Sequence, residues 1–188
     1  ADLRLAAGQL VLVDRLVATV GEQALTWRDV EAARLLGSVP AAGAPAEAIE
    51  RLVTRELMHI EVERLAVAAP IAAAVDERLD RARERAGGAD ALLRALSRLG
   101  LTESRARAWV ADDIRIDVYV DQRFTAAAQP TDAEIAQEAA RASGGTPTPV
   151  QMQDARRTMM QARRSALVSD WLAGIRARTP IRIAGTTP

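Results

Sequence analysis

Residues 13–30 read VDRLVATVGEQALTWRDV, and the order of elements in this stretch decides the fold. Val13–Val20 is the clearest strand in the sequence because it is rich in leucine and valine. Gly21-Glu22 then predicts a turn into a short return strand at residues 23–25. A two-stranded hairpin on its own has marginal stability in water. The hairpin therefore needs a third strand from elsewhere in the chain.

The other convincing strand lies near the opposite end of the sequence, where Ile181-Arg182-Ile183 alternates apolar and charged residues after Pro180. We expect Val13–Val20 to pair with Pro180–Ala184, so that a small sheet joins the two ends of one domain covering residues 13–188. Residues 1–12 have a mixed composition, and we expect a flexible lead there.

About seven helices are expected between these strands, which makes the fold mainly α. The first follows Thr26, an N-cap residue with Asp29 three positions later as an approximate capping box. Proline and glycine mark most of the later boundaries. The strongest linker is Ser143–Pro149, which holds one serine, two glycines, two threonines and two prolines. The expected helices cover residues 27–36, 46–67, 72–86, 90–98, 103–127, 131–142 and 150–178.

The composition narrows the class of protein. Hydrophobic residues make up 49% of the chain but aromatic residues only 3%, as expected for helices packed through alanine, leucine, valine and isoleucine. The 25 basic and 25 acidic residues cancel, which disfavours nucleic acid as a partner. The absence of cysteine excludes disulfides, thiol catalysis and cysteine-based zinc sites. No run approaches the roughly 18 apolar residues of a membrane span, so an integral membrane protein is not expected.

Several motifs, in this order, resemble the SurA-type periplasmic chaperone family. The opening Val13–Glu22 with Leu25-Thr26 and Asp29-Val30 is similar to the family's first strand, turn and helix start. Later segments are similar in the same order; they are Ala48–Leu57, Glu61–Val67, Val75–Leu79, Leu92–Leu101 and Pro130–Ile135. The resemblance covers most of residues 13–142, and residues 150–184 are expected to complete the same core.

One departure from the family is large. Its members usually carry prolyl isomerase domains between the sixth and last helices, where this sequence has only residues 143–149. The resemblance thus implies the chaperone core without the isomerase, and no enzyme activity and no cofactor are expected. It also implies a periplasmic protein that holds unfolded or partly folded polypeptides on their way to the outer membrane or out of the cell. The start Ala1-Asp2-Leu3 shows no signal region, so the location rests on the resemblance alone.

Two features could carry chemistry. His59 is the single histidine, with Glu56, Glu61 and Glu63 nearby in sequence; one histidine cannot form a histidine-based metal cluster, and a structural or surface role is favoured. Asp113, Asp117 and Asp121 form a row at helical spacing that could bind a cation or act as an acid–base pair. Ion pairs with arginines of neighbouring helices are the simpler expectation, because carboxylates near a core need partners. Asp112 falls on the polar side and is expected to be solvated.

The last helix mixes arginine with methionine and supplies the best sequence indication of a contact surface. Methionine suits adaptable binding surfaces because its side chain is flexible and polarizable, although it is also an ordinary core residue. The candidate contacts for an unfolded client are Met152, Arg156, Met159, Met160 and Arg163. Trp27, Trp109 and Trp171 lie at apolar positions of three helices and are expected to anchor the core rather than form a ligand cage.

Two further functions stay open at this point. The chain could be an assembly module that binds one specific partner, or itself, since exchange of the terminal helix and strand between two copies is a simple route to a homodimer. An enzyme of unknown type is the least favoured, because the sequence shows no phosphate-binding glycine loop, no serine–histidine–aspartate set and no metal-ligand spacing.

Overall fold

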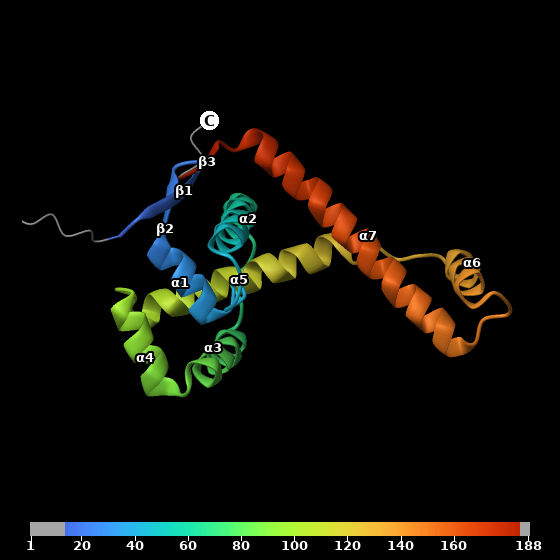
Figure 1. The fold of residues 1–188 in the computed structure, drawn as a ribbon, viewed down its shortest axis with the longest axis horizontal. Helices are drawn as coiled ribbons and strands as arrows, with labels where there is room; N and C mark the ends of the chain where they lie inside the picture. Colours follow the sequence, from blue (N-terminus) through green and yellow to red (C-terminus); the bar gives the residue numbers. More distant parts are fainter. Residues whose placement is uncertain (1–13, 185–188) are drawn as a thin grey trace, which may run out of the picture.

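Three strands join the two ends of the described chain. The computed structural model describes residues 14–184, with strands β1 (Leu16–Val20), β2 (Gln23–Thr26) and β3 (Ile181–Ile183). They form one antiparallel sheet in the order β2-β1-β3, in which Val20 lies opposite Ile181 and Ala18 opposite Ile183 (Figure 1). The predicted pairing of the N-terminal strand with the C-terminal one is confirmed.

β1 begins later than the sequence predicts. Asp14 and Arg15 precede the strand, and the Asp14 carboxylate accepts hydrogen bonds from the backbone N–H groups of Arg15 (2.7 Å) and Arg28 (3.4 Å). Val13, the predicted first residue of the strand, lies outside the described residues, as does the flexible lead expected at residues 1–12.

The third strand is also shorter than the predicted Pro180–Ala184. Its two flanking residues still bind the hairpin through the backbone. The Pro180 carbonyl accepts a hydrogen bond from the N–H of Gly21 (2.8 Å), and the N–H of Ala184 donates to the Val17 carbonyl (2.9 Å). Gly21 has a φ of +58°, in the left-handed region that the tight turn between β1 and β2 requires.

Seven helices lie in the described residues, and local signals place most of their ends. Thr26 and Asp29 form the predicted capping box, and Thr131 with Glu134 forms another. The helices are α1 (Trp27–Leu36), α2 (Pro45–Arg64), α3 (Ala72–Ala86), α4 (Ala89–Arg98), α5 (Glu103–Phe124), α6 (Asp132–Ser143) and α7 (Pro149–Arg178).

Two helices end earlier than predicted. α2 stops at Arg64 rather than at residue 67, because Ala66 takes a φ of +50° and the N–H of Val67 turns back to the Val62 carbonyl (3.2 Å). α5 stops at Phe124 rather than at residue 127, and residues 125–128 continue as turns before Pro130. In both places the apolar pattern continues for about one turn beyond the helix itself.

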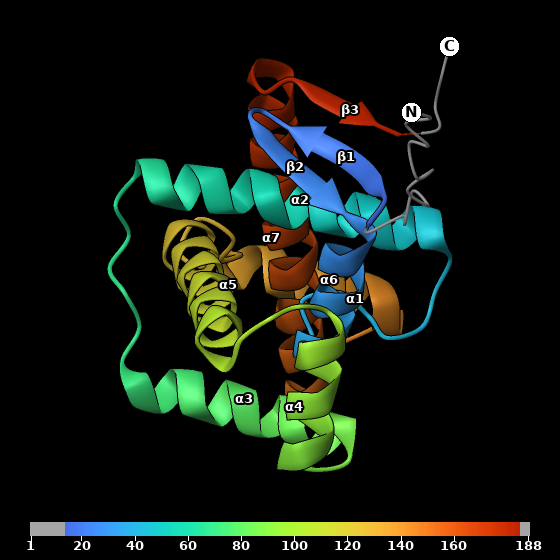
Figure 2. The same ribbon diagram turned by 90° about the vertical axis from the view of Figure 1, so that its left-hand side faces the viewer.

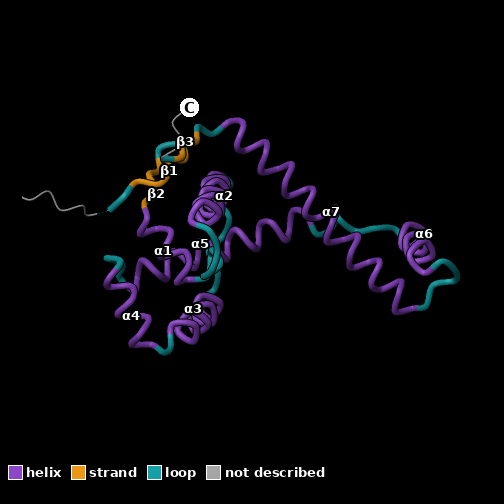
Figure 3. The backbone as a smooth tube through the Cα atoms, in the orientation of Figure 1, coloured by secondary structure: helices purple, strands orange, loops and turns teal. Residues whose placement is uncertain are grey.

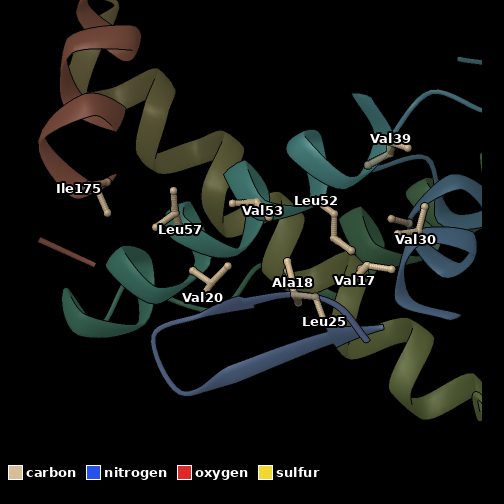
Figure 4. Packing of buried hydrophobic residues seen from close by; sticks show 12 residues of the cluster. Val17, Ala18, Val20, Leu25, Val30, Val39, Leu52, Val53, Leu57 and Ile175 are labelled. Atoms are coloured by element: carbon tan, nitrogen blue, oxygen red, sulfur yellow. The ribbon is translucent and has the colours of Figure 1, made fainter. Parts of the chain in front are cut away.

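The main core lies between the sheet and α2 (Figure 4). Val17, Val20 and Leu25 from the hairpin face Leu52 and Leu57 of α2, all five being at most 5% exposed. α1 contributes Val30 and α7 contributes Ile175 to the same cluster. Each such side chain contributes roughly 1.5–3 kcal/mol on burial. This core holds both ends of the described chain against one helix.

A second core joins α3, α4 and α5 around Leu79, Leu92, Leu96 and Val110. In Figure 2, α5 is seen nearly end-on, with α2 on one side and α3 and α4 on the other. The three tryptophans support these cores as predicted: Trp27 and Trp171 pack against the first, and Trp109 packs against both.

α6 and the N-terminal half of α7 form an arm that projects from this body (Figures 1 and 3). The arm has its own small core of Ile135, Ala139 and Ala155, against which Met152 and Met159 pack. Its loop covers residues 144–148, because the first residue of the predicted linker ends α6 and the last one begins α7.

None of the helices in residues 14–184 combines the length and apolar character needed to cross a bilayer.

Candidate binding groove

An open groove runs along α5 from the end of α1 to the arm. It consists of three adjoining hollows of about 360, 840 and 430 Å³. The first and second share Met58, Ile116 and Asp117, and the second and third share Val120, Arg164 and Val168. We call this continuous feature the α5 groove. Its walls come from α2, α3, α5 and α7, so segments far apart in the sequence build one surface.

The floor of the α5 groove is largely apolar. Ile116 and Val120 stand one helical turn apart on α5, and Val118, which also lines this hollow, is 41% exposed. Met58 from α2 and Val168 from α7 face the same hollow, and Met160 continues the apolar lining along the arm. Apolar side chains gathered in an open hollow are typical of a site that binds a partner.

The aspartate row of α5 lies along this groove, and each of its members meets an arginine from a different helix. Asp113 pairs with Arg55 of α2 at 2.6 Å, Asp117 with Arg78 of α3 at 2.7 Å, and Asp121 approaches Arg164 of α7 at 3.4 Å. The predicted salt-bridge role of the row is confirmed. The three pairs connect α5 with each of the helices that wall the groove.

A buried polar network underlies one end of the groove. Arg55 and Asp113 are each 7% exposed, and the Arg55 guanidinium lies 4.1 Å from the centre of the Trp109 ring. The Trp109 indole N–H donates to Ser38 Oγ (2.8 Å), which donates in turn to the second oxygen of Asp113 (2.5 Å). The network ties the corner after α1 to α2 and α5, and it fixes the spacing of the two helices that form the groove.

The five client contacts predicted from the sequence divide between two sides of α7. Met160 lines the α5 groove. Met152 and Met159 pack in the arm core, and two arginines bind α6: Arg156 pairs with Asp132 (2.7 Å) and Arg163 with Glu134 (2.5 Å). The Arg163 guanidinium, followed by the backbone and hydroxyl of Thr131, lowers the pKa of Glu134 to about 2.

The sequence prediction did not include the other apolar groove residues. The sequence does contain apolar patterns that include them. A second apolar stripe of α2 begins at Met58, and Val118 and Val120 of α5 fall in the same helical arc as the aspartate row. Residues in such arcs either pack against a neighbour or line an open surface, and only the placement of α7 distinguishes the two outcomes.

A different hollow, of about 540 Å³, lies beside β2 and contains His59. The His59 Nε2 atom lies 3.3 Å from Asp112 Oδ2 and 3.9 Å from Glu63 Oε1, and the His59 Nδ1 atom lies 3.5 Å from Glu56 Oε1. The prediction that Asp112 is solvated is therefore wrong. Its carboxylate is held between His59 and the Arg115 guanidinium, which lies 3.2 Å away.

These side chains form an ion-pair network. Ligand atoms of His59, Glu63 and Asp112 lie within 4.8 Å of one another, a spacing compatible with a metal ion. However, the Arg115 guanidinium bonds to both Glu63 and Asp112. Hydrogen bonds to Asp112 and then Glu56 raise the pKa of His59 to about 9, so the imidazole is protonated at neutral pH. Binding of a metal ion would require His59 to lose its proton and Arg115 to release both carboxylates, so these contacts fit the structural role favoured from the sequence.

This network predicts a loss of stability at alkaline pH. The pKa of His59 is raised in the folded state, so its contribution is complete below about 6.5, the value in the unfolded chain, and is lost as pH rises through about 9. We expect the wild type to lose about 1–2 kcal/mol between pH 7 and pH 10 through this residue, after allowance for partial exposure. His59→Gln removes that part of the pH dependence. Urea unfolding of both proteins at pH 7, 8.5 and 10 measures the difference; parallel pH profiles would contradict the assignment.

The chain matches no protein-family model, and no curated protein matches it. A functional assignment therefore rests on the residues and the geometry of the α5 groove.

Proposed function

We propose that this protein is an ATP-independent chaperone that holds unfolded or partly folded polypeptides in the α5 groove. The observation that carries the proposal is the groove itself, with its apolar floor left open between α5 and α7. The main core, the second core and the core of the arm do not include the groove side chains Val118 and Met160, which therefore remain available to a partner.

The shape of the groove favours an extended polypeptide. Three adjoining hollows in series offer successive contacts to side chains along one chain, rather than a single enclosed cavity for a small molecule. Each apolar contact contributes about 25 cal/mol per Å² removed from water, so binding is weak at each hollow and additive along the groove. Release by dilution or by client folding then needs no energy source.

The resemblance to SurA-type chaperones agrees with this function. It also supplies the proposed periplasmic location and the proposed clients, which are exported and outer-membrane proteins. The proposed function does not include prolyl isomerisation, because residues 144–148, where that family has its isomerase domains, form only the loop between α6 and α7.

A charge placed in the groove is expected to abolish holding. Val118→Asp puts a carboxylate at the hollow that Ile116, Val120 and Val168 also line, where it opposes apolar burial. Because Val118 is already 41% exposed, the fold tolerates the change. We expect about a tenfold loss of capacity to suppress aggregation of three unrelated denatured proteins, measured by light scattering.

Val150→Asp is the matched control, since Val150 is 67% exposed at the start of α7 and does not line the groove. It should protect as well as the wild type does. Equal protection by the Val118 and Val150 variants would exclude the groove as the holding surface. Protection of only one of the three proteins would favour an assembly module with a specific partner.

A further inference from the structure

The six arginines of α7 fall into two groups. Four of them donate hydrogen bonds to a carboxylate on another element, which fixes their guanidinium groups. The partners are Asp132 for Arg156 (2.7 Å), Glu134 for Arg163 (2.5 Å), Glu50 for Arg176 (2.7 Å) and Glu61 for Arg178 (2.8 Å). These four arginines serve to join the arm and the end of α7 to the rest of the fold.

Arg157 and Arg164 behave differently. Arg157 approaches Asp154 on its own helix at 3.2 Å, and Arg164 approaches Asp121 at 3.4 Å. Within the described part of the chain, neither guanidinium donates a hydrogen bond of normal geometry, and Arg164 Nε is buried without a partner. A guanidinium carries five N–H donors, and a buried donor left unpaired costs free energy.

Both of these arginines line the arm section of the α5 groove. They stand seven residues apart, two turns along one face of α7, with Met160 between them. Val120 and Val168 complete the apolar part of this hollow of about 430 Å³, and none of its described lining residues is acidic. The section therefore combines an apolar surface with two positive charges that have donors to spare.

We propose that the arm section selects polypeptide segments in which apolar side chains are flanked by carboxylates. This inference rests on the proposed holding function and names its preferred clients. A carboxylate accepts two parallel hydrogen bonds from a guanidinium, a geometry that matches the free donors of Arg157 and Arg164. The apolar residue beside it packs on Met160, Val120 and Val168.

Three capped peptides with the same valine–leucine centre test the selection, with glutamate, glutamine or lysine on both sides of that centre. Isothermal titration calorimetry at low salt should show the glutamate peptide binding about tenfold more tightly than the glutamine peptide, and the lysine peptide binding most weakly. The advantage should shrink at 0.5 M salt, because partly exposed ion pairs are screened.

Substitutions test whether the glutamate preference comes from these two arginines or from the net charge of the protein. Replacing both Arg157 and Arg164 with glutamine should remove the glutamate preference, so that the glutamate and glutamine peptides bind this variant with equal affinity. The matched control replaces Arg94 of α4 and Arg141 of α6, both exposed and outside the groove, and changes the net charge equally. A glutamate preference that survives in the groove variant, or is absent from the wild type, overturns the inference while leaving the holding function. Failure of all three peptides to bind overturns both.

Discussion

Replacement of Asp113 by alanine is expected to lower the free energy of unfolding by about 3–5 kcal/mol. The substitution leaves the Arg55 guanidinium buried at 7% exposure without its strongest partner, because Glu56 lies farther away at 3.7 Å. It also removes the acceptor of the Ser38 hydroxyl, which in turn receives the Trp109 indole N–H. Urea denaturation followed by tryptophan fluorescence measures the loss directly, since Trp109 is part of the network.

Asp117→Ala provides the comparison one turn along the same helix. Asp117 also pairs with an arginine at 2.7 Å, but its side chain is 60% exposed, so its loss should cost less than about 1 kcal/mol. Equal losses for the two variants would show that burial is not what makes the Arg55–Asp113 pair important. A double variant, Arg55→Met with Asp113→Leu, should regain most of the stability because it removes the uncompensated charge.

The sequence predicts the local features of this fold well. Thr26 and Asp29, which lie within four residues of each other, mark the start of α1, and a glycine directly after each of α1, α3 and α6 marks the end of that helix. These boundaries can be recognised without knowledge of any distant contact. The joining of β1 to β3 was also predictable, for a different reason: a lone hairpin needs a third strand, and the sequence offers a convincing one only at its far end.

The groove was harder to predict because it depends on where distant helices lie. α7 carries two apolar sets, with Met152 and Met159 on one side and Met160 and Val168 on the other. The position of α6 decides which of the two sets is covered, and the periodicity of the sequence gives no information on that position. The same reason applies to Asp112, whose partner His59 lies on α2. Its position on α5 alone suggests a solvated carboxylate.

Ile175→Ala is expected to cost about 2–5 kcal/mol and to impair holding as well. Ile175 is 1% exposed and is the single side chain of α7 that is fully buried in the main core, in the same cluster as Leu57 and the hairpin residue Val20 (Figure 4). Trp171 also holds this end of α7, packing on Tyr119 and Phe124 of α5 at ring distances of 5.5 and 5.6 Å. Two ion pairs with α2, Arg176–Glu50 and Arg178–Glu61, and the pairing of β3 add further contacts.

The effect on holding follows from the place of α7 in the groove. Met160, Arg164 and Val168 form one wall of the groove, and α5 forms the facing one, so their separation depends on how firmly the end of α7 is seated. Ile175→Val keeps most of the buried volume and should cost only about 0.5–1.5 kcal/mol. Aggregation suppression measured well below the melting temperature of each variant should therefore follow the order wild type, valine, alanine. An alanine variant that remains folded and holds clients as well as the wild type would show that the groove does not need this anchor.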